Sequence, residues 1–364
     1  MNARTIRLGL AFALVCSVWL APVGAQPMGA QGEDFLYKVE PADTLEALSL
    51  RYTQNASNWR ELQQINHIED PYRVPIGFVL RIPFRLIPEV PGHARVVHVT
   101  GEVTIEGRSL QAGDTVTAGQ ALHSGPAGVA TLKLPDDSLL TLSPDSTLIL
   151  DRLHLFQGTG LTDSILKMND GSLESIVAPG DTGVGRFEVR TPVTVTGVRG
   201  TRLRVSAAAD GVRNEVVQGT MAIDTPKAAE FTIRQGQGAA IGPTGENLGI
   251  RALLPAPNLP VPKRTGGQWG MTFPPVPGAQ AYRVRVTSDP DGALTSSTSD
   301  FTEPTVQFSA NKPGTHYVFV RAIDDLGLGG IDAGMPFEGR IVLQTSDGRP
   351  VLSGSGQAIG LGET

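Results

Sequence analysis

The residues whose side chains could carry out chemistry are few and widely spaced. The 6 His residues lie apart, and none forms the His-Glu-x-x-His pair that holds a catalytic metal. Asp136-Asp137 and Asp324-Asp325 are adjacent carboxylates that could supply an acid and a base for glycan cleavage. Neighbouring strand residues point to opposite faces, so we interpret both pairs as turn residues. Because no Gly-x-Ser-x-Gly elbow or phosphate-binding loop is present either, the sequence predicts a protein that is not an enzyme and needs no metal or cofactor.

The N-terminal residues have the composition of an export signal. Two arginines precede an apolar run at residues 8–20, and a group of small residues ends at Ala25, where a signal peptidase would cut. We therefore predict a cleavable signal peptide at residues 1–25, with an uncleaved anchor as the alternative. No later stretch approaches the roughly 20 apolar residues of a membrane helix, so we expect no transmembrane segment in the mature chain.

The composition argues against further classes of function. Cys16 is the only cysteine and lies inside the predicted signal, so the mature chain would have no disulfide, cysteine-bound metal or thiol nucleophile. The formal net charge is -6 and there is no basic stripe, which argues against nucleic acid as a partner. The 43 Gly and 27 Pro, with few aromatic residues, favour many short strands and turns over helix bundles.

Proline-containing breaks at residues 87–92 and 252–264 divide the mature sequence into three modules. The second break has alternating prolines, which favour an extended spacer. We expect a first module at 35–86, a second at 93–251, a Pro-rich linker at 252–264, a third module at 265–346 and a flexible tail at 347–364. The predicted fold class is multidomain and mainly β.

Helical signals are confined to the first module. Residues 37–39 predict a short strand, and Asp43 is a plausible helix cap because Glu46 follows three residues later. A second helix is expected from Asn58, with Trp59 on its apolar face, and the alternation of apolar residues at 78–82 predicts a closing strand. This order predicts a small βααβ unit.

Both later modules show the period-2 alternation of β-strands. Apolar residues alternate with polar ones at residues 130–134, and turn signals recur at short intervals, which predicts an all-β second module. Its architecture is either a sandwich or a rolled, solenoid-like sheet. In the third module Arg283 and Arg285 alternate with apolar residues and are expected to face water. Trp269 and Phe273 are available there for the core of a small β-sandwich.

The first module carries a series of residues in a characteristic order and spacing: Tyr37-x-Val39, Asp43-Thr44-Leu45, Leu48, Leu62, Asn66-x-Ile68, Pro71, Ile76-x-x-x-Leu80 and Ile82-Pro83. This series resembles the LysM family and covers nearly the whole module. One departure is Ala42, which stands where the family usually has Gly before the Asp-Thr pair. If that position needs a positive φ, Ala costs more free energy than Gly, and the first loop is shifted.

The LysM resemblance implies binding of a glycan that contains N-acetylglucosamine, which in a bacterium means peptidoglycan. In LysM domains the sugar lies in a shallow groove between the loop after the first strand and the loop after the second helix. The matching residues here are Asp43, Thr44 and Leu45 on one side and Asn66, Ile68 and Pro71 on the other. Two of them have an alternative structural role, since Asp43 could cap one helix and Asn66 could end another.

The second module carries another series: Gly101-x-Val103, Leu110-x-x-Gly113-Asp114, Gly119-x-x-Leu122, Ala130-x-Leu132-x-Leu134, Gly171-x-Leu173, Phe187-x-Val189-x-Thr191-Pro192, Val198-Arg199-Gly200-Thr201 and Val217-x-Gly219. This series resembles the FecR-type periplasmic domain, although Asp136-Asp137-Ser138 stands where the family often has Asp-Gly-Ser. FecR signal transducers have a cytoplasmic segment and a membrane helix ahead of this domain. This sequence has a predicted signal peptide and a LysM-type module there instead, so direct control of a sigma factor is not expected.

The third module is generically similar to fibronectin type III-like domains, through residues 282–286 and 320–327. We therefore predict a non-catalytic periplasmic protein whose LysM-type module holds the FecR-type and β-sandwich modules on peptidoglycan, with envelope proteins as further candidate partners. One alternative is a FecR-like sensory or regulatory protein that acts through an outer-membrane partner. Another is a peptidoglycan hydrolase with an unrecognised site.

Overall fold

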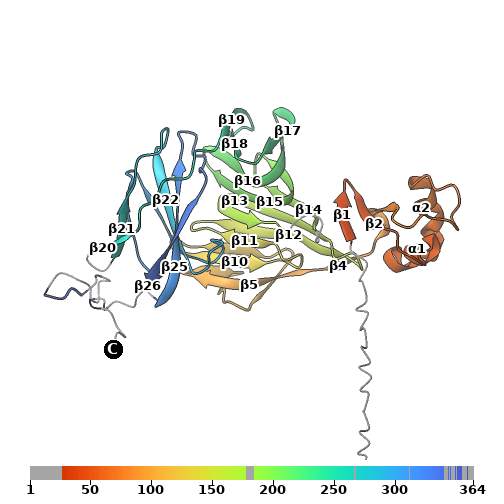
Figure 1. Cartoon of the computed structure of the whole chain (residues 1–364), viewed down its shortest axis with the longest axis horizontal. Coiled ribbons are helices and arrows are strands. Elements are labelled where there is room, and N and C mark those ends of the chain that lie inside the picture. Colours follow the sequence, from red (N-terminus) through yellow and green to blue (C-terminus); the bar gives the residue numbers. More distant parts are fainter. Residues whose placement is uncertain are drawn as a thin grey trace, which may run out of the picture.

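The computed structural model describes residues 27–177, 184–265, 268–310 and 312–339, and the separate positions 343, 345, 349, 351–354 and 359. The predicted signal peptide and most of the predicted tail lie outside these residues. A small helical module, a large sheet and a small sandwich follow one another along the long axis of the molecule (Figure 1). Within the described part of the chain, no helix is long and apolar enough to cross a membrane.

The first module is a three-stranded antiparallel sheet with two helices. Its sheet order is β1-β2-β3, formed by β1 (Pro27–Gln31), β2 (Asp34–Lys38) and β3 (Val79–Pro83). Between β2 and β3 lie α1 (Leu45–Thr53), the 3-10 helix η1 (Ala56–Asn58) and α2 (Trp59–Ile65), and η2 (Phe84–Leu86) follows β3. The predicted strand, helix, helix, strand order is present, and β1 is an additional strand that lacks an alternating apolar pattern.

The start of α1 differs from the prediction by one residue. Thr44, not Asp43, is the N-cap, and its hydroxyl accepts a hydrogen bond of 3.1 Å from the backbone N–H of Ala47. Thr44 has the extended backbone that an N-cap requires. The prediction that Asp43 caps the helix is therefore wrong, and its carboxylate is used in the preceding loop instead. The second helix does begin after Asn58, although the Asn58 side chain makes no capping bond.

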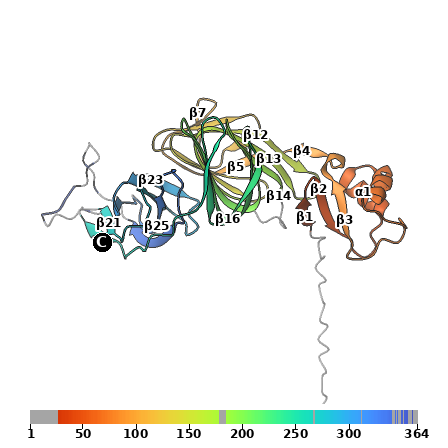
Figure 2. The same cartoon turned by 90° about the horizontal axis from the view of Figure 1, so that it is seen from above.

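The second module is one sheet of 16 strands. The strands are β4 (Glu89–Pro91), β5 (His93–Thr100), β6 (Val103–Ile105), β7 (Arg108–Ser109), β8 (Thr115–Thr117), β9 (Ala121–Ser124), β10 (Val129–Lys133), β11 (Leu139–Leu142), β12 (Thr147–Phe156), β13 (Thr162–Ile176), β14 (Val184–Arg190), β15 (Val195–Ala208), β16 (Gly211–Thr225), β17 (Ala228–Arg234), β18 (Gln237–Ile241) and β19 (Asn247–Ala252). The sheet is rolled, as the view from above shows (Figure 2). Most of its buried apolar side chains form one hydrophobic cluster. Of the two predicted alternatives, the rolled sheet is the one present.

The long strand β13 allows the sheet to roll because it changes partners along its length. Its first half pairs with β12 and, in parallel, with β14, whereas its second half pairs with β11 and β15. Gly171 lies at the change, with a φ of 93°. A Cβ atom there would lie 2.4 Å from the Cα of Ser146, so only Gly fits this close approach.

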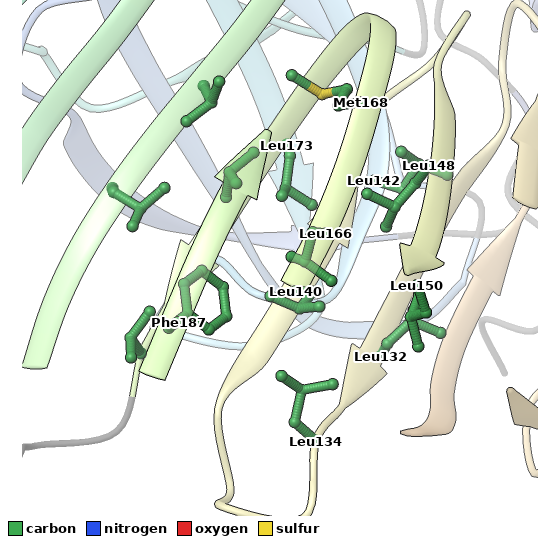
Figure 3. Close-up of a cluster of buried hydrophobic side chains, with 14 of the residues drawn as sticks. Leu132, Leu134, Leu140, Leu142, Leu148, Leu150, Leu166, Met168, Leu173 and Phe187 are labelled. Atoms are coloured by element: carbon green, nitrogen blue, oxygen red, sulfur yellow. The ribbon is translucent and has the colours of Figure 1, made fainter. Parts of the chain in front are cut away.

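Alternating apolar side chains fill the interior of the rolled sheet. Leucines from β10, β11 and β12 point into one cluster with Leu166, Met168 and Phe187 (Figure 3). Burial of each such side chain stabilises the fold by about 1.5–3 kcal/mol. The polar residue Thr131 is also buried. Its hydroxyl is satisfied there because it donates a hydrogen bond of 2.7 Å to the carbonyl of Ala293 in the third module. The outer face of β10 is therefore covered by that module.

The third module packs two small sheets against each other. One has the order β20-β21-β24, with β20 (Lys263–Thr265), β21 (Gln268–Thr272) and β24 (Thr305–Phe308). The other has the order β23-β22-β25-β26, with β22 (Ala281–Thr287), β23 (Thr295–Phe301), β25 (Gly314–Ile323) and β26 (Ala333–Gly339). Phe273 is in their shared core and Trp269 packs against it. Leu254, inside the predicted spacer, also packs against this core, and its carbonyl accepts a hydrogen bond from the N–H of Ile331.

The expectation that Arg285 faces water is wrong. Arg285 is only 4% exposed, because this face of β22 and β25 lies against the rolled sheet. Its guanidinium contacts Glu174 of β13 at 2.9 Å and Asp332 at 3.1 Å. Arg321 also contacts both carboxylates. We call these four residues the buried ion cluster.

The first module shares its core with the rolled sheet. The rings of Phe84 and Phe156 stack with their centroids 4.2 Å apart, and Leu161 belongs to the same cluster. The segment between the modules is itself a strand, because β4 pairs with β12. Glu89 in β4 also contacts His154 of β12 at 2.7 Å. The two modules are thus joined by a core and a strand ladder.

Candidate glycan-binding site

A pocket of about 140 Å³ lies in the first module where the start of α1 meets the loop after α2. Its lining residues are Thr44, Leu45, Glu46, Trp59, Pro71 and Tyr72. Leu45 is buried and provides an apolar floor, whereas the Tyr72 side chain is 89% exposed at the rim. This is the pair of loops in which the LysM resemblance places the glycan.

The loop before α1 is fixed by a buried tyrosine. The Tyr37 hydroxyl donates a hydrogen bond of 2.8 Å to the Asp43 carboxylate, which also accepts one of 2.8 Å from the N–H of Glu40. Burial and the hydrogen bond to Asp43 both raise the pKa of the Tyr37 hydroxyl. Tyr37 therefore remains a neutral donor, and Asp43 positions Thr44 and Leu45 without lining the pocket itself.

Ala42 stands in the same loop with a φ of 74°, in the left-handed region. The position at which the LysM family usually has Gly thus takes a positive φ in this chain, and Ala42 adopts it at a cost in free energy. A residue other than Gly, Asn or Asp is strained there by roughly 1–2 kcal/mol. The hydrogen bonds of Asp43 hold the loop in place against this strain.

Asn66 and Ile68 do not line the pocket. The Asn66 amide donates to the carbonyls of Leu62 and Arg81, both at 2.8 Å, and its oxygen accepts from the N–H of Arg81 at 2.7 Å. Asn66 thus ties the end of α2 to β3. Ile68 packs against the core of the module. Of the six residues predicted from the sequence, Thr44, Leu45 and Pro71 meet in the pocket, and contact of any of the six with sugar stays a prediction.

Three pocket residues were missed by the sequence analysis: Glu46, Trp59 and Tyr72. Glu46 and Trp59 had been interpreted only as a capping partner and as part of an apolar helix face. Tyr72 follows Pro71 directly in the sequence. Its position next to a predicted glycan contact was the feature that could have identified this aromatic residue as a pocket residue. Aromatic rings suit sugar binding because their faces pack against sugar C–H groups.

A larger cavity and the two adjacent carboxylate pairs are accounted for by structural contacts. A larger cavity of about 520 Å³ lies between η2 and strands β14–β17, but its Arg186 is already paired with Asp163 at 2.7 Å. Asp136 accepts hydrogen bonds from Thr162 and from the N–H of Ser138, and Asp324 accepts two from its own turn, so both carboxylate pairs serve turns. Among the residues that the structure describes, no cluster of His, Cys, Asp and Glu could hold a metal ion.

The fold defines a modular, mainly β protein with a small domain at one end that carries an aromatic-lined pocket. Two family models match the chain, the LysM domain at residues 37–83 and the FecR protein at residues 120–222. Both predicted resemblances are therefore confirmed, in the predicted order. These are families of non-catalytic binding and regulatory domains, typical of extracytoplasmic proteins. The fibronectin type III-like character of the third module stays a prediction.

Several solved structures are distantly similar to this chain. Two crystal structures of a candidate anti-sigma factor from Parabacteroides distasonis are 17% and 18% identical, with a TM-score of 0.30, and cover 36% of this chain. This chain spans 59% of their length. A β-1,2-glucanase from the same organism is 12% identical with a TM-score of 0.21, over 68% of this chain and 36% of the glucanase. Comparison with curated proteins gives no match.

Proposed function

We propose that this chain is a non-catalytic periplasmic protein that binds peptidoglycan through its first module and so holds the rolled sheet and the sandwich at the cell wall. The pocket between α1 and the loop after α2 is the observation that carries the proposal, because the LysM match covers all of its residues. Trp59 and Tyr72 offer aromatic surface to the sugar, and Thr44 and Glu46 offer polar groups. Export by a signal cleaved after Ala25 belongs to the same proposal.

Sedimentation with purified sacculi tests this function. The full chain without residues 1–25 should sediment with sacculi, and Tyr72→Ala should weaken binding about fivefold, the effect of losing a contact of roughly 1 kcal/mol. Tyr72 is so exposed that its replacement leaves the core intact. Ile76→Ala is the matched control, since Ile76 is 70% exposed nearby but does not line the pocket. Equal binding by Tyr72→Ala and wild type, or no sedimentation of either, would contradict the proposal.

A second candidate function is sensory or regulatory, through an outer-membrane partner. The FecR match at residues 120–222 favours it. The test is a pull-down from envelope extract with the Tyr72→Ala variant, which separates protein contacts from wall binding. Capture of an outer-membrane transporter or receptor supports this function. Recovery of no such protein, under conditions where the variant is folded, counts against it.

A further inference from the structure

The pocket of the first module contains one charged side chain among its described lining residues, that of Glu46. Glu46 lies in the first turn of α1 and is exposed. Its carboxylate makes no hydrogen bond or ion pair with any other described side chain, so it is available to a ligand. The remaining lining residues are uncharged, which leaves the pocket with a net negative charge.

The neighbouring cations do not neutralise this charge inside the pocket. The guanidinium of Arg60 lies 4.8 Å from the centre of the Trp59 ring, and Arg60 does not line the pocket. Arg51 lies over the rings of Tyr37 and Tyr52. Arg73 is 3.8 Å from Asp70 and is almost fully exposed. Glu46 therefore determines the charge that a bound sugar meets.

A carboxylate in this position distinguishes two forms of one sugar. A fully N-acetylated glucosamine is neutral, and its amide N–H can donate a hydrogen bond to the Glu46 carboxylate without forming an ion pair. A glucosamine with a free 2-amino group is an ammonium, which adds the attraction between opposite charges to the hydrogen bond with Glu46. The ring face of Tyr72 attracts the same cation.

Building on the glycan-binding function proposed above, we propose that Glu46 is a specificity-determining residue that makes the pocket select glycans carrying free 2-amino groups. The substrate class is a partly de-N-acetylated glucosamine polymer. Loss of the acetyl group removes contacts made by its methyl and carbonyl, and the ammonium–carboxylate contact compensates for that loss. The chain thus binds wall glycan whose amino groups have been exposed.

Isothermal titration calorimetry with two defined probes tests this specificity. The probes are the N-acetylglucosamine hexamer and the glucosamine hexamer, at a mildly acidic pH that keeps the sugar amine protonated. Glu46→Gln should weaken binding of the glucosamine hexamer about fivefold, as for one partly exposed ion pair, and change binding of the acetylated hexamer less than twofold. Added salt should weaken only the wild-type complex with the glucosamine hexamer.

Glu69→Gln is the control for long-range charge, because Glu69 is an exposed acid of the same module outside the pocket. It should leave both affinities unchanged. Equal effects of Glu46→Gln on the two probes, or no effect on either, would overturn the role of Glu46. Failure of the wild type to bind the acetylated hexamer or sacculi would instead count against the proposed function, so the two failures are distinguishable.

Discussion

Ala42 holds a backbone conformation that Gly adopts without strain. Its φ of 74° lies in the loop that leads into α1. Ala42→Gly should raise the free energy of unfolding of the first module by about 1 kcal/mol, since relief of the strain exceeds the entropy that Gly adds to the unfolded chain. Urea unfolding followed by circular dichroism measures the change. An Ala47→Gly variant is the control, because this helical position should lose stability, and a loss at Ala42 as well would contradict the assigned strain.

Asn66 is expected to act on stability rather than on sugar contact. Its amide makes three hydrogen bonds to Leu62 and Arg81. Asn66→Ala should therefore destabilise the module by roughly 2 kcal/mol, and Asn66→Asp, which keeps only the acceptor, by an intermediate amount. The folded fraction of both variants should bind sacculi as the wild type does. Weaker binding by fully folded Asn66→Ala would instead place this side chain in the glycan site.

The residues of the site could be predicted only in part. Thr44, Leu45 and Pro71 follow from the LysM series because they stand in the family's own loops. Asp43 and Asn66 belong to the same series, but their partners Tyr37 and Arg81 become neighbours only when the sheet forms. Trp59 had an apolar helix face as its obvious role. Trp59 lines the pocket only because the loop with Pro71 and Tyr72 lies opposite it. The spacing of apolar residues within a helix does not predict the position of that loop.

At the scale of elements, the junction of Phe84 in η2 with Phe156 in β12 decides whether the first module is stable. Phe156 is 5% exposed and belongs to the core cluster of a module that begins far from it in sequence. Phe156→Ala should therefore destabilise the first module by about 3 kcal/mol, although the substitution lies in the second. Trp59 fluorescence during urea unfolding reports the first module, in a chain without residues 1–25 that also carries Trp269→Phe.

Leu248→Ala is the matched control for this junction, because Leu248 is 46% exposed on β19. It should leave the Trp59 transition unchanged. If Phe156→Ala also leaves that transition unchanged, the two modules unfold independently and the shared core does not couple them.

Strand positions were predictable from alternation, but strand neighbours were not. The apolar residues that alternate at 130–134, namely Ala130, Leu132 and Leu134, are all buried. The alternation of apolar and polar residues predicts which face of a strand is buried. It does not predict which strand lies beside it. The choice between sandwich and rolled sheet depended on β13 exchanging β12 and β14 for β11 and β15. That exchange is a long-range event, visible in the sequence only as Gly171.

At the scale of the whole molecule, the buried ion cluster joins the rolled sheet to the sandwich. Its arginines are 4% exposed, so a lone charge left there would be costly. Arg285 was expected to face water because it alternates with the apolar residues of β22. The face of β22 that carries Arg285 instead packs against the rolled sheet. The same argument explains Thr131 on β10. Contact between modules is the part of the fold that a pattern within one module cannot predict.

Acid should weaken this junction. Burial acts to raise the pKa of Glu174 and of Asp332, but Arg285 and Arg321 outweigh it and hold both pKa values below their ordinary 4.5 and 3.8. Both carboxylates therefore stabilise the fold above those values and lose this contribution as the pH falls below them. Burial raises the pKa of nearby Glu215, which acts in the opposite direction. Because the pKa is lowered for Glu174 and Asp332 and raised only for Glu215, the unfolding temperature should fall between about pH 5 and pH 3.

Glu174→Gln tests the cluster directly. At neutral pH it should destabilise the protein by about 3 kcal/mol, because two buried guanidiniums lose a shared partner. It should also flatten the loss of stability in acid, which differential scanning calorimetry measures. Glu230→Gln, at an exposed acid on β17, is the control. A variant with wild-type stability at neutral pH would show that the cluster does not hold the two modules together.

The strand β4 has a mechanical consequence. It is both the polypeptide that leaves the first module and a member of the sheet, paired with β12 through Glu89, Val90 and Pro91. A pull on the first module from a stretched wall strand would therefore load the β4–β12 hydrogen bonds and the Phe84–Phe156 contact at once, since no slack linker stands between them. Tension in the wall would thus reach the rolled sheet directly, as a force on one of its strands.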